Sequence, residues 1–83
     1  MRMFRPEAPD ARREQELMLL MEQNKTRLMR MAYMYLGDQA MAEEAVQDTF
    51  LKAYAHLDRF RGDSRPETWL TRIAINTCKD MRR

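Results

Sequence analysis

Residues 60–83 read FRGDSRPETWLTRIAINTCKDMRR, a short polar loop that leads into a helix with two different faces. One face follows from a spacing of i, i+3, i+7, i+10 and i+14, which aligns side chains on one side of a helix. It carries an aromatic ring, an amide and three cations: Trp69, Arg72, Asn76, Lys79 and Arg83. The interleaved face is mostly apolar and predicts contact with a core: Leu70, Ile73, Ala74, Thr77 and Met81.

The polar face of this helix has the side chains that a nucleic-acid interface needs. Cations neutralise phosphates, an amide reads a base edge, and an aromatic ring stacks on an unpaired base. The same spacing also fits an ordinary solvated face beside a buried tryptophan. The spacing alone does not separate these two interpretations.

A first helix is predicted to run from about Ala11 to Leu36, where Gly37 suits a helix C-terminus because glycine readily takes a positive φ. Its apolar positions have helical spacing: Leu17, Leu20, Met21, Leu28, Met31, Ala32 and Tyr35. Asn24 and Lys25 interrupt this stripe. We therefore expect either a kink at that point or a break into two helices.

A second helix is predicted to start after Asp38, a residue type that caps helix N-termini well. Its apolar stripe is regular: Ala42, Val46, Thr49, Phe50, Ala53, Tyr54 and Leu57. The polar residues between them are expected to point away from the core: Glu43, Glu44, Gln47, Asp48 and Lys52. Residues 57–63 form a predicted loop, and Ser64 with Glu67 forms a capping box that opens the third helix.

Composition supports a small helical domain. The chain has 83 residues, 45% of them hydrophobic and 34% charged, and no alternating strand pattern occurs in it. We predict an all-α fold of three compact helices, or four if the first one breaks, with residues 1–10 as a flexible N-terminal arm and 11–83 as the domain. One core should bury five residues together: Val46, Phe50, Leu70, Ile73 and Ala74.

Several classes of protein are disfavoured. No apolar run approaches the ~20 residues of a membrane span, so we expect no membrane insertion. The single cysteine, Cys78, cannot form an internal disulfide, which favours the reducing cytoplasm, and it is expected to be a small buried residue. His56 and Cys78 have no obvious orienting partner, and neither zinc spacing nor a glycine-rich phosphate loop occurs. We predict no catalytic residue, no metal site and no cofactor.

Charge is unevenly distributed along the chain. Residues 38–55 hold four acids and one lysine, a net charge of −3, whereas residues 56–83 hold seven cations and four acids, a net charge of +3. An acidic helix beside a basic loop and helix suggests two partners of opposite charge. Two solvated faces would give the same distribution.

Residues 36–83 resemble region 2 of the bacterial extracytoplasmic-function (ECF) sigma factors. Four segments carry the resemblance in order: the glycine–acid turn at 37–38, AEEAVQDTF at 42–50, FRGDS at 60–64 and TWLTRIAIN at 68–76. Residues 21–36 fit the preceding helix of the family more loosely. Two positions depart from the pattern: Pro66-Glu67 replace an aromatic and a basic residue, and Asn24 replaces a common aromatic.

The resemblance implies a domain that docks on the clamp helices of the beta-prime subunit of core RNA polymerase. It also implies recognition of the minus-ten promoter element, on the non-template strand, while that DNA opens. The implied polymerase contacts are Glu44, Gln47 and Asp48. The implied DNA contacts are the loop Arg61, Gly62, Asp63 and Ser64, the base reader Asn76, the junction aromatic Trp69, and the phosphate-binding residues Arg72, Lys79, Arg82 and Arg83.

Other interpretations stay open. The resemblance implies an anti-sigma factor as a further partner, and a helical adaptor module is an alternative function. A duplex-binding domain of the helix-turn-helix type is another, and a preference for single-stranded DNA would argue against it. The family's region 4 is absent before Arg83, so we interpret the chain as a part of a longer protein rather than a stand-alone region 2.

Overall fold

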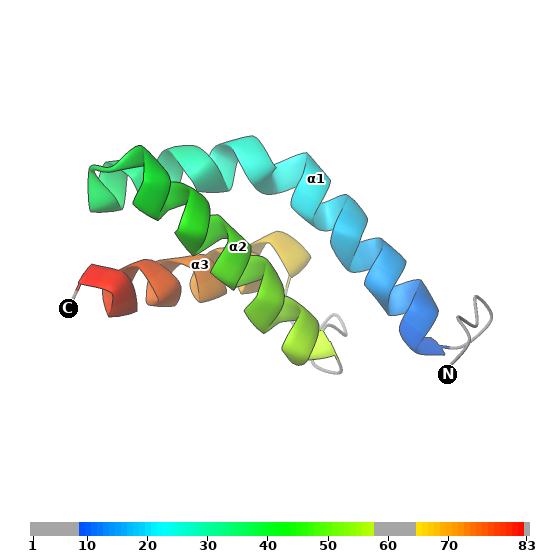
Figure 1. The fold of residues 1–83 in the computed structure, drawn as a ribbon. Helices are drawn as coiled ribbons and strands as arrows, with labels where there is room; N and C mark the ends of the chain where they lie inside the picture. Colours follow the sequence, from blue (N-terminus) through cyan, green and yellow to red (C-terminus); the bar gives the residue numbers. More distant parts are fainter. Residues whose placement is uncertain (1–8, 58–64, 83) are drawn as a thin grey trace.

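The computed structural model describes residues 9–57 and 65–82 of the chain. Within those ranges the protein forms three helices and no strand: α1 (Pro9–Leu36), α2 (Gln39–Ala55) and α3 (Pro66–Arg82). Each helix packs against the other two. Figure 1 shows α2 turning back along α1, with α3 beside the C-terminal half of α1. The predicted all-α, three-helix fold is confirmed.

Helix α1 is continuous over 28 residues, so the four-helix alternative is wrong. It begins at Pro9, two residues before the predicted start, because proline has no amide hydrogen to leave unpaired in a first helical turn. Residues 9 and 10 of the predicted arm are helical, and residues 1–8 lie outside the described ranges, so the arm stays a prediction.

Figure 1 shows α1 changing direction midway along its length, in agreement with the predicted kink. The interrupting residue Asn24 is buried, with its Nδ2 donating a hydrogen bond to the Leu20 carbonyl oxygen at 2.8 Å. Its Oδ1 accepts from Arg27 Nε at 3.3 Å and from Arg27 Nη2 at 3.1 Å. A side chain that bonds the carbonyl four residues earlier tends to bend a helix without breaking it. Because both ends of the amide are paired, its burial is tolerated.

The turn between α1 and α2 has the predicted chemistry. Gly37 takes a φ of +72°, and its amide donates to the Tyr33 carbonyl oxygen at 2.7 Å. Asp38 caps α2, because its Oδ1 accepts from the Met41 amide at 2.9 Å.

Helix α3 begins next to Arg65, whose carbonyl oxygen accepts from the Trp69 amide at 3.0 Å. The capping box predicted at Ser64 lies outside the described residues.

The core lies where the three apolar stripes meet, and most of its predicted members are buried. The buried apolar residues are Ala11, Leu17, Leu20, Met21, Leu28, Ala32, Ala42, Ala45, Val46, Ala53, Leu57, Leu70, Ala74 and Cys78. Of the five residues predicted to be buried together, Phe50 and Ile73 are only half-buried and pack against this core from its edge. Tyr54, predicted within the α2 stripe, is 47% exposed. Tyr54 lies near the C-terminal end of α2, where its hydroxyl donates to Glu14 Oε2 of the N-terminal part of α1 at 2.9 Å.

Candidate nucleic-acid interface

The polar face predicted for the third helix is present on α3. Arg72, Asn76 and Lys79 are exposed along it. Among the described residues, none of these three side chains makes a hydrogen bond or an ion pair within the protein. Their charges and amide are therefore available to a ligand.

Trp69 differs from its neighbours on the same face, because its ring is half-buried and packs against the core. Part of the Trp69 ring is therefore taken up by packing, and its role at a DNA junction stays a prediction. Arg82 is exposed, and its guanidinium lies 5.1 Å from the centroid of the Tyr35 ring on α1. Arg61, Gly62, Asp63, Ser64 and Arg83 lie outside the described residues.

Lys52 of α2 contacts two polar side chains of α3. The Lys52 Nζ donates to Thr77 Oγ1 at 3.1 Å and lies 3.9 Å from Asp80 Oδ2. Thr77 precedes the exposed Lys79 and follows Asn76 in the chain. Lys52 was expected to point away from the core, and it does stay accessible, but it reaches α3 rather than open solvent. The contact adds a polar link between α2 and the Asn76–Lys79 segment to the packing of the two helices in the core.

A groove between α1 and α3 extends the polar face beyond what the sequence predicted. Its lining comes from both helices: Arg27, Glu67, Thr68, Thr71, Arg72 and Ile75. Arg27 enters it because its Nη2 donates to Thr71 Oγ1 at 3.0 Å. These two residues are 44 positions apart, so no local pattern in the sequence signals their contact.

The second predicted surface, on α2, carries Glu44, Gln47 and Asp48. Glu44 and Gln47 are exposed and Asp48 is half-buried. Since they are spaced three and four residues apart, they share one side of the helix. Leu51, one turn further along that side, is 60% exposed. The exposed apolar Leu51 therefore lies at the C-terminal edge of the acidic side of α2, where a partner could cover it.

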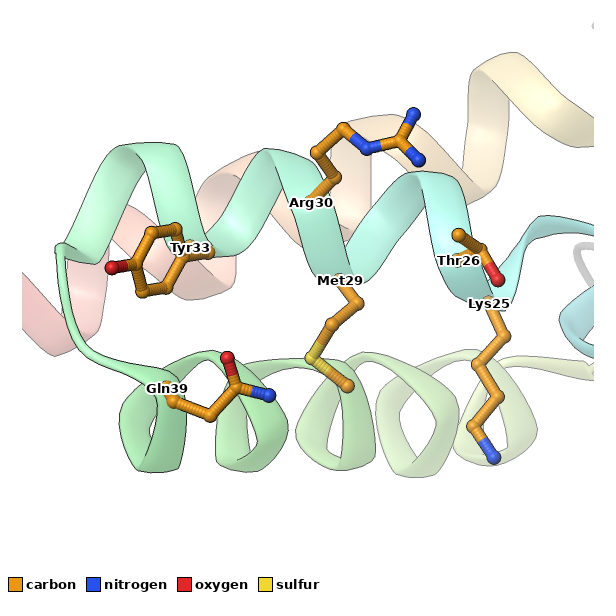
Figure 2. A pocket seen from close by; sticks show the side chains of 6 residues that line it. All are labelled: Lys25, Thr26, Met29, Arg30, Tyr33 and Gln39. Atoms are coloured by element: carbon orange, nitrogen blue, oxygen red, sulfur yellow. The ribbon is translucent and has the colours of Figure 1, made fainter.

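Figure 2 shows a separate open groove between α1 and α2, with a volume of about 560 Å³. Its lining residues are Lys25, Thr26, Met29, Arg30, Tyr33 and Gln39. In Figure 2 the Met29 side chain points toward α2, whereas the Lys25 and Arg30 side chains point in opposite directions. The two cations do not converge on one point, so this groove lacks the geometry of an anion site.

Within residues 9–57 and 65–82, no cluster of three potential metal ligands occurs. None of the described helices is long and apolar enough to cross a membrane. Cys78 is buried, as expected, and its burial raises the pKa of the thiol. A buried thiol with a raised pKa is a poor nucleophile, since the thiolate is the reactive form.

Comparison with known proteins gives a consistent result. Residues 20–83 match the family described as Sigma-70 region 2. The ECF RNA polymerase sigma-E factor of Escherichia coli (strain K12) is 44% identical over 64 residues, which cover 77% of this chain and 32% of that protein. The sigma-E factor of Salmonella typhimurium (strain LT2) has the same identity and coverage.

The RNA polymerase sigma-H factor of Pseudomonas aeruginosa is 42% identical over 65 residues, which cover 78% of this chain and 33% of the relative. The chain thus spans about a third of the length of the curated relatives that it matches. No solved structure is significantly similar to it.

Proposed function

The chain belongs to the sigma-70 region 2 family, and on this premise we propose that it is a transcription initiation module that docks on core RNA polymerase and recognises the minus-ten promoter element. The observation that carries the proposal is the presence of two different polar surfaces on helices that contact each other. One is the acidic side of α2, with Glu44, Gln47 and Asp48, and the other is the face of α3 that includes Arg72, Asn76 and Lys79.

In the proposed docking, the acidic side of α2 pairs with basic residues of the clamp helices of the beta-prime subunit. Asp48 is half-buried, so an ion pair made there would be partly removed from water, where charge pairing is stronger. Gln47 adds hydrogen bonds beside it. The apolar Leu51 would lose solvent contact at the edge of the same interface.

In the proposed DNA recognition, α3 lies along the opened non-template strand. Arg72, Lys79, Arg82 and Arg83 neutralise phosphates, and the Asn76 amide hydrogen-bonds a base edge. The Trp69 ring stacks at the junction between duplex and single strand. The loop Arg61, Gly62, Asp63 and Ser64 is proposed to capture an unstacked base, for which a glycine allows close approach of the backbone.

Transcription takes place where the polymerase is, so the proposed location is the cytoplasm. Sigma factors are not enzymes, and the proposed role requires neither a cofactor nor a catalytic residue. An anti-sigma factor as a further partner stays a prediction. No feature of α3 favours the duplex-binding alternative over the single-stranded one, and binding of duplex in preference to single-stranded DNA would support that alternative.

The docking is tested by capture of bacterial core RNA polymerase on the immobilised chain. Asp48→Arg is expected to weaken the affinity by about 2 kcal/mol or more, because it replaces an attractive ion pair with a repulsive one. Glu22→Arg is the matched control: it makes the same charge change at an exposed position on α1, away from the acidic side of α2. Equal losses in the two variants, or no loss in either while both are folded, would place the docking surface elsewhere.

A further inference from the structure

The α1–α3 groove is lined by two arginines that come from different helices. It is an open depression of about 410 Å³ lined by Arg27 of α1 and by Glu67, Thr68, Thr71, Arg72 and Ile75 of α3. The polar lining thus consists of two arginines, two threonine hydroxyls and one carboxylate. None of the contacts proposed above for α3 uses Arg27.

Arg27 is held in this groove by hydrogen bonds to both helices. Its Nη2 donates to Thr71 Oγ1 at 3.0 Å and to Asn24 Oδ1 at 3.1 Å, and its Nε donates to the same Asn24 oxygen at 3.3 Å. The Thr71 hydroxyl in turn donates to the Glu67 carbonyl oxygen at 2.7 Å. Among the described residues, Arg27 Nη1 has no hydrogen-bond partner, so part of the guanidinium is left to bind a ligand.

The Asn24 amide explains why this arginine is oriented. Asn24 is buried, and its Nδ2 is already bonded to the Leu20 carbonyl oxygen, which leaves Oδ1 facing Arg27. A guanidinium held in advance loses less conformational freedom when it binds an anion. Asn24 thus orients the Arg27 guanidinium before an anion binds, at the point where α1 bends.

Arg72 supplies the second cation of the groove. It is exposed, and within the described ranges its side chain makes no hydrogen bond or ion pair. Two neighbouring arginines repel each other until an anion lies between them, and a phosphate accepts hydrogen bonds from such guanidinium forks. Asn76 follows Arg72 by one helical turn, so the groove is continuous with the face of α3 proposed to read DNA.

We propose that the α1–α3 groove binds one backbone phosphate of the single-stranded promoter DNA, with Arg27 and Arg72 as its two cationic ligands. This inference rests on the proposed function, because it extends the strand path along α3 onto α1. Glu67 lies in the same groove, and its carboxylate opposes the phosphate. The groove therefore has one residue whose loss weakens DNA binding and one whose loss strengthens it.

The test uses the 83-residue chain and a short fluorescein-labelled single-stranded DNA, with affinity measured by fluorescence anisotropy over a series of KCl concentrations. Arg27→Gln removes the charge but keeps an amide that can bond Asn24 and Thr71. The association constant K falls as the salt concentration rises, so the slope of log K against log salt is negative. Losing one phosphate contact should make this slope shallower by about 0.7. Glu67→Gln should raise the affinity.

Lys25→Gln is the matched control, because it makes the same charge change on α1, and Lys25 belongs to the groove between α1 and α2 rather than to the α1–α3 groove. Its salt slope should equal that of the wild type. If Arg27→Gln lowers the melting temperature but leaves the slope unchanged, Arg27 is only a link between helices and the inference is wrong, while the proposed function stands. If the wild-type chain itself fails to bind single-stranded DNA, the proposed DNA recognition fails as well.

A second titration with poly-glutamate distinguishes DNA from an acidic protein partner. Arg27→Gln should weaken DNA binding more than poly-glutamate binding, since a tetrahedral phosphate uses both arginines at one point. Equal losses for both polymers would overturn the phosphate assignment and indicate a site for an acidic protein segment.

Discussion

At the scale of single residues, Cys78 illustrates how the core controls chemistry. Its side chain is 1% exposed, and burial raises the thiol pKa above its ordinary value of 9.0. Below that value the thiol is protonated in both the folded and the unfolded chain. At higher pH the unfolded chain loses the proton first, so the free energy of unfolding should fall as pH rises toward the folded pKa.

The measurement is urea denaturation of the wild type and of Cys78→Ala at about pH 8 and about pH 10. The decrease in stability between the two conditions should be smaller in Cys78→Ala, whose other titrating groups are unchanged. A thiol reagent such as Ellman's reagent should modify the native protein slowly and the urea-unfolded protein fast. Rapid modification of the native state would show that the thiol is not buried in solution.

Leu70 and Leu51 form a matched pair for testing the core. Leu70 is fully buried on α3, whereas Leu51 is 60% exposed on α2. Leu70→Ala should cost about 2–5 kcal/mol of unfolding free energy, because it removes buried methyl groups and leaves a cavity. Leu51→Ala should change stability by only about 0.5 kcal/mol or less. Chemical denaturation gives both values, and similar costs at the two positions would contradict the assigned core.

At the scale of helices, the C-terminus of α1 and the N-terminus of α2 depend on the adjacent residues Gly37 and Asp38. Asp38→Ala removes the acceptor of the Met41 amide and should cost about 1 kcal/mol, while Asp38→Asn should cost much less because asparagine also caps. Gly37→Ala meets no neighbouring atom within 4 Å, so any cost comes from the positive φ alone.

Thermal melting followed by circular dichroism measures these three variants. Gly37→Ala should melt below the wild type because alanine disfavours a positive φ. For the cap, the expected order of stability is wild type, then Asp38→Asn, then Asp38→Ala. If Asp38→Asn and Asp38→Ala lose the same stability, the side-chain hydrogen bond is not what stabilises the start of α2.

At the scale of the whole molecule, the three helices form one folding unit because each one contacts the other two. Side-chain links also join all three pairs: Glu14 with Tyr54, Arg27 with Thr71, and Lys52 with Thr77. We expect one cooperative unfolding transition with a urea m-value of about 1 kcal/mol/M, as is usual for a small domain.

Two probes test this cooperativity. Far-UV circular dichroism reports all helices, and the fluorescence of Trp69, the single tryptophan, reports the packing of α3. The two urea curves should coincide. A fluorescence change that precedes the loss of helix would show that α3 detaches from α1 and α2 before they unfold.

Features that depend on local interactions could be predicted from the amino-acid sequence alone. Three helices, the Gly37 turn, the Asp38 cap and the burial of Cys78 were all predicted, because helical periodicity and capping act over about one turn of chain. The exposed face with Arg72, Asn76 and Lys79 followed from the same periodicity.

Features that depend on how closely the helices approach one another could not be predicted from the sequence. Periodicity did not reveal that Phe50 and Tyr54 lie at the rim of the core, or that Lys52 reaches α3. It predicted a kink or a break at Asn24, and the structure has the kinked, unbroken alternative with a fully paired buried amide. The contact of Arg27 with Thr71 joins residues 44 positions apart, and only the packing of α1 against α3 brings such groups together, because side-chain spacing along one helix carries no information about its neighbour.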